Sequence, residues 1–147
     1  MAGFLLDTKV VGELVRPAPD PQVAAWILAQ RPMDLFLSAI SLGELARGIG
    51  RIAPGQRRGR LARWLDTDLP GQFPGRILAF GPETALIWGR LMAEADRRGR
   101  PKPAIDAMIA ATAKQHGLAL ATRNLRDLAD LGLNLIDPWR TTSRAGP

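Results

Sequence analysis

Four acidic residues stand at places where a folded chain could gather them: Asp7, Glu44, Asp106 and Asp127. Carboxylates held close together repel one another strongly unless a cation neutralises them. The chain has no cysteine and a single histidine, so such a cluster favours the hard cations Mg²⁺ or Mn²⁺ over zinc. A cation of this kind can hold phosphate oxygens and activate water. Hydrolysis of a phosphodiester is therefore the chemistry that these residues indicate.

Asp106 lies in the segment PKPAIDAMIAATAKQHG, residues 101–117. Pro103 near its start and Gly117 at its end predict a helix between them. On that helix Asp106 lies beside the apolar stripe, with Ala110 and Ala113 following at i+4 and i+7, and no Lys or Arg of the helix itself stands four residues away. Two interpretations stay open: a carboxylate favoured by the start of the helix dipole, or a carboxylate whose partner is a metal ion or a substrate.

The other acids also have local explanations. Asp7 follows an apolar strand and could only begin a turn, and Glu44 lies off its helix stripe, as a solvated residue would. Asp127, three residues after Asn124, fits a capping arrangement at a helix start. Further polar residues follow predicted strands and could support a site: Ser38, Thr122 and Asn124.

The elements that would position these residues alternate along the chain. Short apolar segments predict five strands, at 3–8, 34–38, 76–80, 118–122 and 133–137. Helical patterns lie at 22–30, 39–52, 54–69 (broken by Pro70-Gly71), from Pro82 past Ala95, 103–117 and 125–131. Strands alternating with helices predict an α/β fold, with a parallel sheet of about five strands covered on both faces. In such a sheet the ligand site lies beyond the carboxyl ends of the strands, where Asp7, Glu44 and Asp106 should meet.

Composition narrows the class of protein. The chain has 147 residues, 46% of them hydrophobic, which predicts one globular domain. We expect that domain over residues 1–140 and a flexible tail over 141–147. Without cysteine there is no thiolate metal site, and the single histidine, His116, ends a helix, where a structural role is expected. No segment is long and apolar enough to span a membrane, and no export signal is evident, so the cytoplasm is the expected compartment.

The chain is also strongly basic, with a formal net charge of +6 and a pI near 11.2. Residues 45–65 contain six arginines and no acid, and a second basic run, RRGRPK, covers 97–102. Such runs are often only solvated faces. Together with the high pI they favour RNA or DNA as a partner, although an acidic protein would fit as well. No phosphate-binding glycine motif follows any predicted strand, which argues against a nucleotide-binding domain.

These motifs together resemble a PIN-domain ribonuclease, specifically the VapC/FitB-type toxin of bacterial toxin–antitoxin pairs. The matching segments are LLDTKVVGELVRP, LFLSAISLGELARGI, PAIDAMIAATAKQHGLALATRN and LIDPW, in order over nearly the whole chain. The resemblance implies a three-layer α/β/α fold, an Mg²⁺ or Mn²⁺ site and endonucleolytic cleavage of RNA, either tRNA or mRNA. It also implies a homodimer and inhibition by a cognate antitoxin protein.

The resemblance also assigns roles to single residues. Asp7, Glu44 and Asp106 are similar to the three main acids of the family. Asp7 and Asp106 are expected to bind the metal directly, and Glu44 to bind it or to orient its water. The fourth position falls on either Asn124 or Asp127, and Thr122 and Ser38 would be supports. Lys9 departs from the family pattern, which usually has Asn or Ser there; its ammonium could compete with the metal ion or simply face solvent. The alternative is a catalytically inactive PIN-fold module that only binds a nucleic acid or a protein partner.

Overall fold

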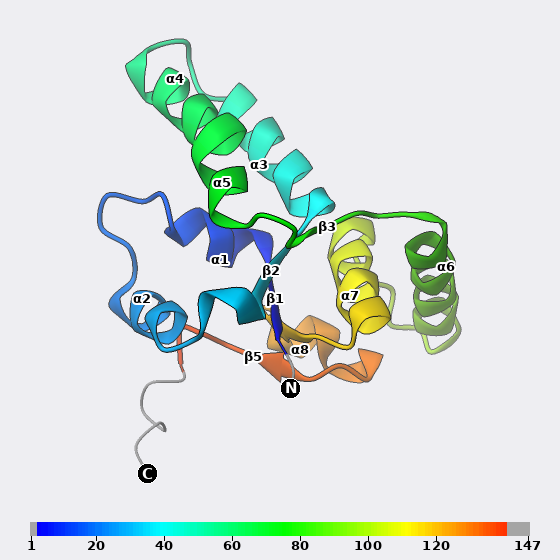
Figure 1. The fold of residues 1–147 in the computed structure, drawn as a ribbon. Helices are drawn as coiled ribbons and strands as arrows, with labels where there is room; N and C mark the ends of the chain where they lie inside the picture. Colours follow the sequence, from blue (N-terminus) through cyan, green and yellow to red (C-terminus); the bar gives the residue numbers. More distant parts are fainter. Residues whose placement is uncertain (1–2, 141–147) are drawn as a thin grey trace.

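The computed structural model describes residues 3–140, and these form a five-stranded parallel sheet between two layers of helices (Figure 1). The strands are β1 (Phe4–Leu6), β2 (Leu35–Ser38), β3 (Ile77–Leu78), β4 (Ala119–Ala121) and β5 (Leu135–Ile136). Their spatial order is β3-β2-β1-β4-β5, with every neighbouring pair parallel. The predicted α/β fold with a five-stranded parallel sheet is confirmed. The expected tail at 141–147 lies outside the described residues.

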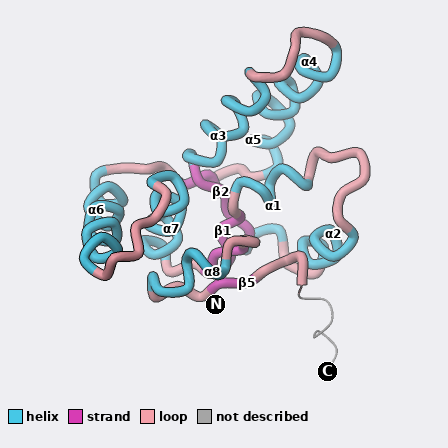
Figure 2. Tube along the Cα trace, turned by 180° about the vertical axis from the view of Figure 1, so that it is seen from behind, coloured by secondary structure: helices cyan, strands magenta, loops and turns pink. Residues whose placement is uncertain are grey.

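In the described part of the chain, eight α-helices connect and flank the strands. They are α1 (Thr8–Glu13), α2 (Pro21–Leu28), α3 (Ala39–Gly50), α4 (Gln56–Arg63), α5 (Leu69–Gln72), α6 (Pro82–Arg97), α7 (Ala104–His116) and α8 (Leu125–Leu128). Helices α1 and α2 lie on one side of the sheet, whereas α6 and α7 lie on the other (Figures 1 and 2). Helices α3, α4 and α5 form an arm that projects from the sheet (Figure 1). Within residues 3–140 no helix combines the length and apolarity needed to cross a membrane.

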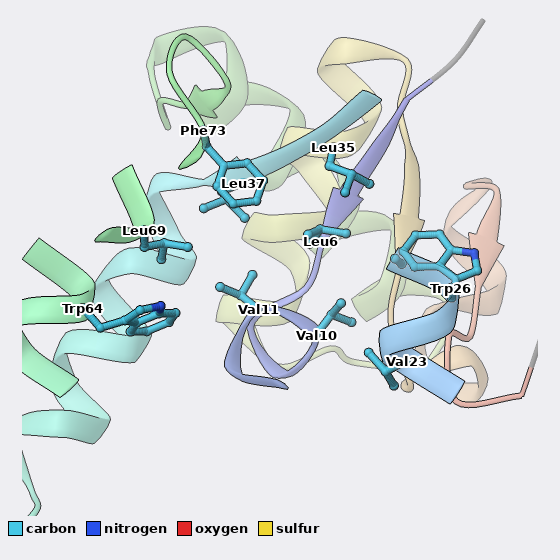
Figure 3. Packing of buried hydrophobic residues seen from close by; sticks show 11 residues of the cluster. Leu6, Val10, Val11, Val23, Trp26, Leu35, Leu37, Trp64, Leu69 and Phe73 are labelled. Carbon is cyan, nitrogen blue, oxygen red and sulfur yellow. The ribbon is translucent and has the colours of Figure 1, made fainter. Parts of the chain in front are cut away.

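The core has two halves because successive side chains of β1 point to opposite faces of the sheet. Leu6 belongs to the half formed with α1, α2 and the arm, which includes Val10, Trp26 and Trp64 (Figure 3). Leu5 belongs to the other half, which contains the apolar face of α7. The alanines of that face are fully buried, so α7 can lie close against the sheet.

The order of the strands places a crevice beside β1. The chain goes from β1 outward to β2 and β3 on one side, and to β4 and β5 on the other. Ligand sites of open parallel sheets lie where the strand order reverses in this way, outside the carboxyl ends of the strands. The Asp7 amide donates to the carbonyl oxygen of Ala121 at 2.9 Å, which keeps the ends of β1 and β4 together. The acids predicted at strand ends are therefore delivered to one edge.

The prediction that a helix breaks at Pro70-Gly71 was wrong. A π-helical turn, Trp64–Asp68, follows α4, and α5 then continues through both residues to Gln72. Proline is tolerated there because it occupies the first turn of α5, where no intrahelical donor is required. The π turn shifts the register of the hydrogen bonds: the Leu69 amide donates to the carbonyl of Trp64.

Candidate active site

A hollow of about 360 Å³ opens at the carboxyl ends of β1 and β4. The residues that line it come from both halves of the chain: Asp7, Thr8, Lys9, Glu44, Asp106, Arg123 and Asn124. Three of the four predicted acids therefore share one small concave surface. A hydrogen-bond network connects them, and its parts come from the junction of β1 and α1, from α3 and α7, and from the segment after β4.

Asp7 is held at the junction of β1 and α1, where it is the N-cap residue of the helix. The backbone amide of Thr8 donates to its Oδ1 at 2.8 Å. The hydroxyl of Thr122 donates to its Oδ2 at 2.7 Å, and Thr122 is fully buried. Because both carboxylate oxygens accept a hydrogen bond from an ordered donor, the orientation of Asp7 is set by the fold.

Glu44 is positioned through Thr8. The Thr8 hydroxyl donates to Glu44 Oε1 at 2.6 Å and lies 2.9 Å from the hydroxyl oxygen of Ser41. Since the single hydroxyl proton of Thr8 goes to Glu44, Ser41 donates to Thr8. Ser41 is fully buried on α3, one helical turn before Glu44. Thr8 thus connects the end of β1 to the carboxylate on α3.

Asp106 lies in the first turn of α7, half-buried, where it faces the other acids. The side-chain amide of Asn124 donates to its Oδ2 at 3.2 Å. Burial raises the pKa of Asp106 above its ordinary value of 3.8, and the negative charges of Asp7, Glu44 and Asp127 raise it further, whereas the charge of Lys9 acts in the opposite direction. The helix dipole alone would favour the ionised form, so burial and repulsion between carboxylates outweigh it.

The donor set fits a hard cation in chemistry but does not form a closed cage. Among residues 3–140, no three acidic or histidine side chains converge closely enough to hold an ion without moving. The carboxylates nevertheless line one hollow, and each can accept further contacts because a carboxylate offers about four lone-pair positions. A cation among these carboxylates would offset the mutual repulsion that, after burial, raises the pKa of Asp106.

The remaining predicted residues occupy different places. Asp127 is exposed and does not line the hollow, although its charge is near enough to affect Asp106. Asn124 lines the hollow and contacts Asp106 directly. Ser38 is the buried N-cap of α3, accepting from the Ile40 amide at 3.0 Å, so it holds the helix that carries Glu44. Lys9 is exposed but lines the hollow, so its ammonium acts on the acids without a described ion pair to any of them.

Sequence reasoning missed three residues of the site: Thr8 and Arg123, which line the hollow, and Ser41, which is buried and contacts Thr8. Thr8 follows Asp7 at the end of β1, and this position was a usable signal, because a hydroxyl next to a strand-end acid can bridge to the next element. Ser41 precedes Glu44 by three residues and so lies on the same side of its helix. Arg123 carried no signal of its own among 20 basic residues.

The two basic runs differ in what surrounds them. The run at 97–102 is largely engaged within the protein: Arg97 and Arg98 pair with Glu94, whereas Arg100 and Lys102 approach Asp130 at 3.6 and 2.8 Å. Two acids, Glu94 and Asp130, pair with the four cations of this run, so about half of its positive charge is offset within the protein. The arginines of 45–65 lie on α3, α4 and their connection, and no ion pair is described for them within residues 3–140.

Comparison with known proteins agrees with this arrangement. The PIN domain family model matches residues 4–132. Toxin FitB of Neisseria gonorrhoeae is 36% identical over 136 residues, covering 92% of this chain and 98% of FitB. VapC ribonuclease Y4jK of Sinorhizobium fredii is 38% identical, covering 92% of this chain and 97% of that protein. The crystal structure of FitAcB from Neisseria gonorrhoeae superimposes with a TM-score of 0.87 at 36% identity, covering 93% of this chain and 99% of that chain.

A parallel sheet with acidic residues at the carboxyl ends of its central strands, matched by the family model over most of its length, makes this chain a member of the PIN domain family. Within that family it is similar over nearly its full length to proteins named FitB and VapC. The resemblance to the VapC/FitB type is thereby confirmed, as is the three-layer α/β/α fold that it implied.

Proposed function

We propose that this protein is a metal-dependent endoribonuclease that acts as the toxin of a toxin–antitoxin pair. One observation carries the proposal. Asp7, Glu44 and Asp106 line a single hollow, and burial and the charges of Asp7 and Glu44 raise the pKa of Asp106. Uncompensated carboxylates at the carboxyl end of a parallel sheet are what a divalent cation site requires.

Asp7 and Asp106 would bind Mg²⁺ or Mn²⁺ directly, and Glu44 would either bind it or orient its water. When bound, the ion supplies charge stabilisation for phosphate oxygens and a more acidic water molecule. Thr122 and Thr8 hold Asp7. Thr8, which is itself contacted by Ser41, holds Glu44, so these two carboxylates are oriented before a substrate arrives. Asn124 fills the fourth position through Asp106, and Asp127 adds negative charge from outside the hollow.

The charge of the protein and the name of a similar protein support RNA as the substrate. The chain carries a net charge of +6, and basic residues flank the acids, since Lys9 and Arg123 line the same hollow. A similar full-length protein is named a ribonuclease. Positive charge next to an acidic metal site attracts the phosphate backbone to the reacting centre.

Titration with Mn²⁺ tests the proposal. Calorimetry of the wild-type protein should show saturable binding, and cleavage of total cellular RNA should require the same ion. Asp7→Asn should lose both properties, whereas Asp96→Asn, an exposed aspartate on α6, is the matched control and should keep them. A folded wild-type protein without saturable Mn²⁺ binding would favour the alternative, an inactive PIN-fold module that only holds RNA or a partner.

A homodimer and an antitoxin partner complete the proposal, with the cytoplasm as its compartment. Solved chains similar to this one include a toxin–antitoxin complex and the FitAcB structure. A short antitoxin segment would block the acids, and an arginine in it could bridge two carboxylates in place of the cation. Light scattering at micromolar concentration should give a dimer mass. A complex that forms but leaves Mn²⁺ binding and RNA cleavage unchanged would rule out the blocking mechanism.

A further inference from the structure

A second and larger hollow lies directly beside the acidic one. Its volume is about 1100 Å³, and it lies between the start of α2, helix α8 and the segment after β5. The residues that give it charge or aromatic surface are Arg123, Arg126, Arg140, Trp139, Asp20 and Asp137. Arg123 also lines the acidic hollow, so the two depressions share an edge. Enclosed small-molecule sites typically have about 300–1,000 Å³, so this depression has room for more than a single small group.

Arg123 and Trp139 form a preassembled flat surface at that shared edge. The guanidinium carbon of Arg123 lies 4.1 Å from the centre of the Trp139 ring. Trp139 is partly buried and packs against the core half that contains Leu6 and Trp26, so it is a fixed support. Arg123 is exposed. A planar guanidinium that rests on an indole presents its opposite face to solvent, where another flat group can stack.

The two carboxylates in the larger hollow already have partners. Asp20 caps α2 by accepting from the amides of Gln22 and Val23 at 2.9 and 3.2 Å. Asp137 accepts from the Trp139 amide at 2.9 Å, and its second oxygen lies 3.8 Å from Arg140. Within residues 3–140 no ion pair is described for Arg123 or Arg126. The hollow therefore offers positive charge that the protein itself does not neutralise.

We infer that this hollow is a binding subsite for single-stranded RNA next to the bond that is cleaved. Arg126 holds a backbone phosphate, and so does Arg140, since only its Nε approaches Asp137 and its side chain is 84% exposed. A nucleobase stacks on the guanidinium of Arg123. This inference rests on the proposed nuclease function, because the shared edge makes a strand that occupies the acidic hollow continue over Arg123. A stacking plane bordered by cations suits a nucleotide, whereas an acidic peptide would use the charges and leave the plane without a role.

The dependence of cleavage on substrate length tests the subsite. Arg126→Ala/Arg140→Ala removes two exposed arginines of the hollow. The matched control, Arg90→Ala/Lys114→Ala, removes two exposed basic residues from α6 and α7, which lie on the other side of the sheet from α2 (Figure 1). With Mn²⁺ present, the hollow variant should cleave an RNA octamer with kcat/KM at least tenfold below wild type, yet cleave the dinucleotide UpA at the wild-type rate. The control should lose less than threefold on the octamer. Equal losses in the two variants would overturn the subsite.

Binding without catalysis separates this inference from the proposed function. If the wild-type protein cleaves neither substrate, the nuclease proposal fails, and fluorescence anisotropy of a labelled octamer still decides the subsite. The hollow variant should then bind more weakly than the control, with a salt slope smaller by about 0.7 for each lost phosphate contact. Unchanged RNA affinity together with weakened antitoxin binding would assign the hollow to an acidic protein segment and overturn the inference.

Arg123→Lys tests the stacking role because it keeps the charge and removes the flat surface. Wild-type protein should bind an RNA octamer several-fold more tightly than an abasic octamer of equal length and charge. In the lysine variant that preference should shrink to near unity. The same preference in both proteins would show that Arg123 acts only as a charge and would overturn the stacking role.

Discussion

The surroundings of two partly buried aspartates, Asp106 and Asp130, shift their pKa values in opposite directions. Asp106 faces Asp7 and Glu44 across the acidic hollow, and its pKa is raised by burial and by the negative charges near it. Asp130 lies on the 3₁₀ turn Ala129–Leu131, and its pKa is lowered, mainly because the Lys102 ammonium contacts it at 2.8 Å.

The difference between them is the source of the positive charge. Lys102 has only 5% of its side chain exposed and forms an ion pair with Asp130, so the charge of Asp130 is neutralised by the protein itself. Asp106 has an amide donor, Asn124, but no described cation within ion-pair distance. A carboxylate paired inside the protein stabilises the structure, whereas a group of unpaired carboxylates is a place for a cation from solution.

The largest effects on activity and stability should come from replacing Asp106 in the acidic hollow and Asp130 in its ion pair with Lys102. Asp106→Asn should abolish RNA cleavage, because a lost metal contact costs several kcal/mol of transition-state stabilisation, while leaving the free energy of unfolding unchanged or higher. Asp130→Asn should keep cleavage and lower the free energy of unfolding. Cleavage assays and urea denaturation of both variants decide the matter. Full activity in folded Asp106→Asn protein would return this residue to its helix-dipole explanation.

A smaller effect is expected from Lys102→Met, which leaves Asp130 without its main partner. The free energy of unfolding should fall by about 2 kcal/mol, between the values typical of exposed and buried ion pairs. The double variant Lys102→Met/Asp130→Asn should regain part of this loss, because no unpaired charge remains. Urea denaturation of the set gives the coupling. Strictly additive losses would mean that the two residues stabilise the fold independently.

Lys9→Asn should increase the affinity of the acidic hollow for a divalent cation. The ammonium of Lys9 opposes the effect of the other acids on Asp106, so it acts on the same charges as a metal ion would. Its removal should tighten Mn²⁺ binding several-fold, or by about 1 kcal/mol after screening. Calorimetric titration of both proteins measures this. Lys114→Asn, an exposed lysine near the far end of α7, is the control and should bind Mn²⁺ like the wild type.

The smallest expected effect is on the pH dependence of stability. The pKa of Asp130 is lowered by folding, so its stabilisation is present above the unfolded value near 3.8 and is lost as pH falls through the folded value. The pKa of Asp106 is raised, so in metal-free protein its effect is reversed: stability falls as pH rises from about 3.8 through the folded value. Asp130→Asn should reduce the loss of stability at low pH. Asp106→Asn should reduce the fall of stability as pH rises. Identical pH profiles in the two variants would contradict the comparison.

Much of the fold could be predicted because its signals are local. Apolar runs such as LALA, the left-handed Gly117 that ends α7 (φ 65°) and the polar residues after each strand all act within a few residues. The π turn after α4 could not be predicted in this way. It depends on how Trp64 and Leu69 pack into the core, and no short-range pattern encodes that packing.

The residues of the candidate site also fall into those that local sequence signals predicted and those that required the tertiary structure. The positions of Asp7 and Asp106 followed from strand and helix boundaries, but Thr8 as the link between Asp7 and Glu44 required the distance between β1 and α3. The assignment of the two basic runs also required the fold. In the sequence Lys102 is the last residue of a basic run, and the fold buries it against Asp130.

The sequence by itself determined the α/β pattern and the placement of acids at strand ends. The absence of cysteine and the single histidine excluded a cysteine- or histidine-rich metal site. Only the tertiary structure decided which charges are already neutralised. It paired Asp130 with Lys102 and left Asp106 among other acids beside the hollow that Arg123 borders. The physical reason is that the energy between two charges depends on their separation and on the water around them, and both are set when distant segments pack together.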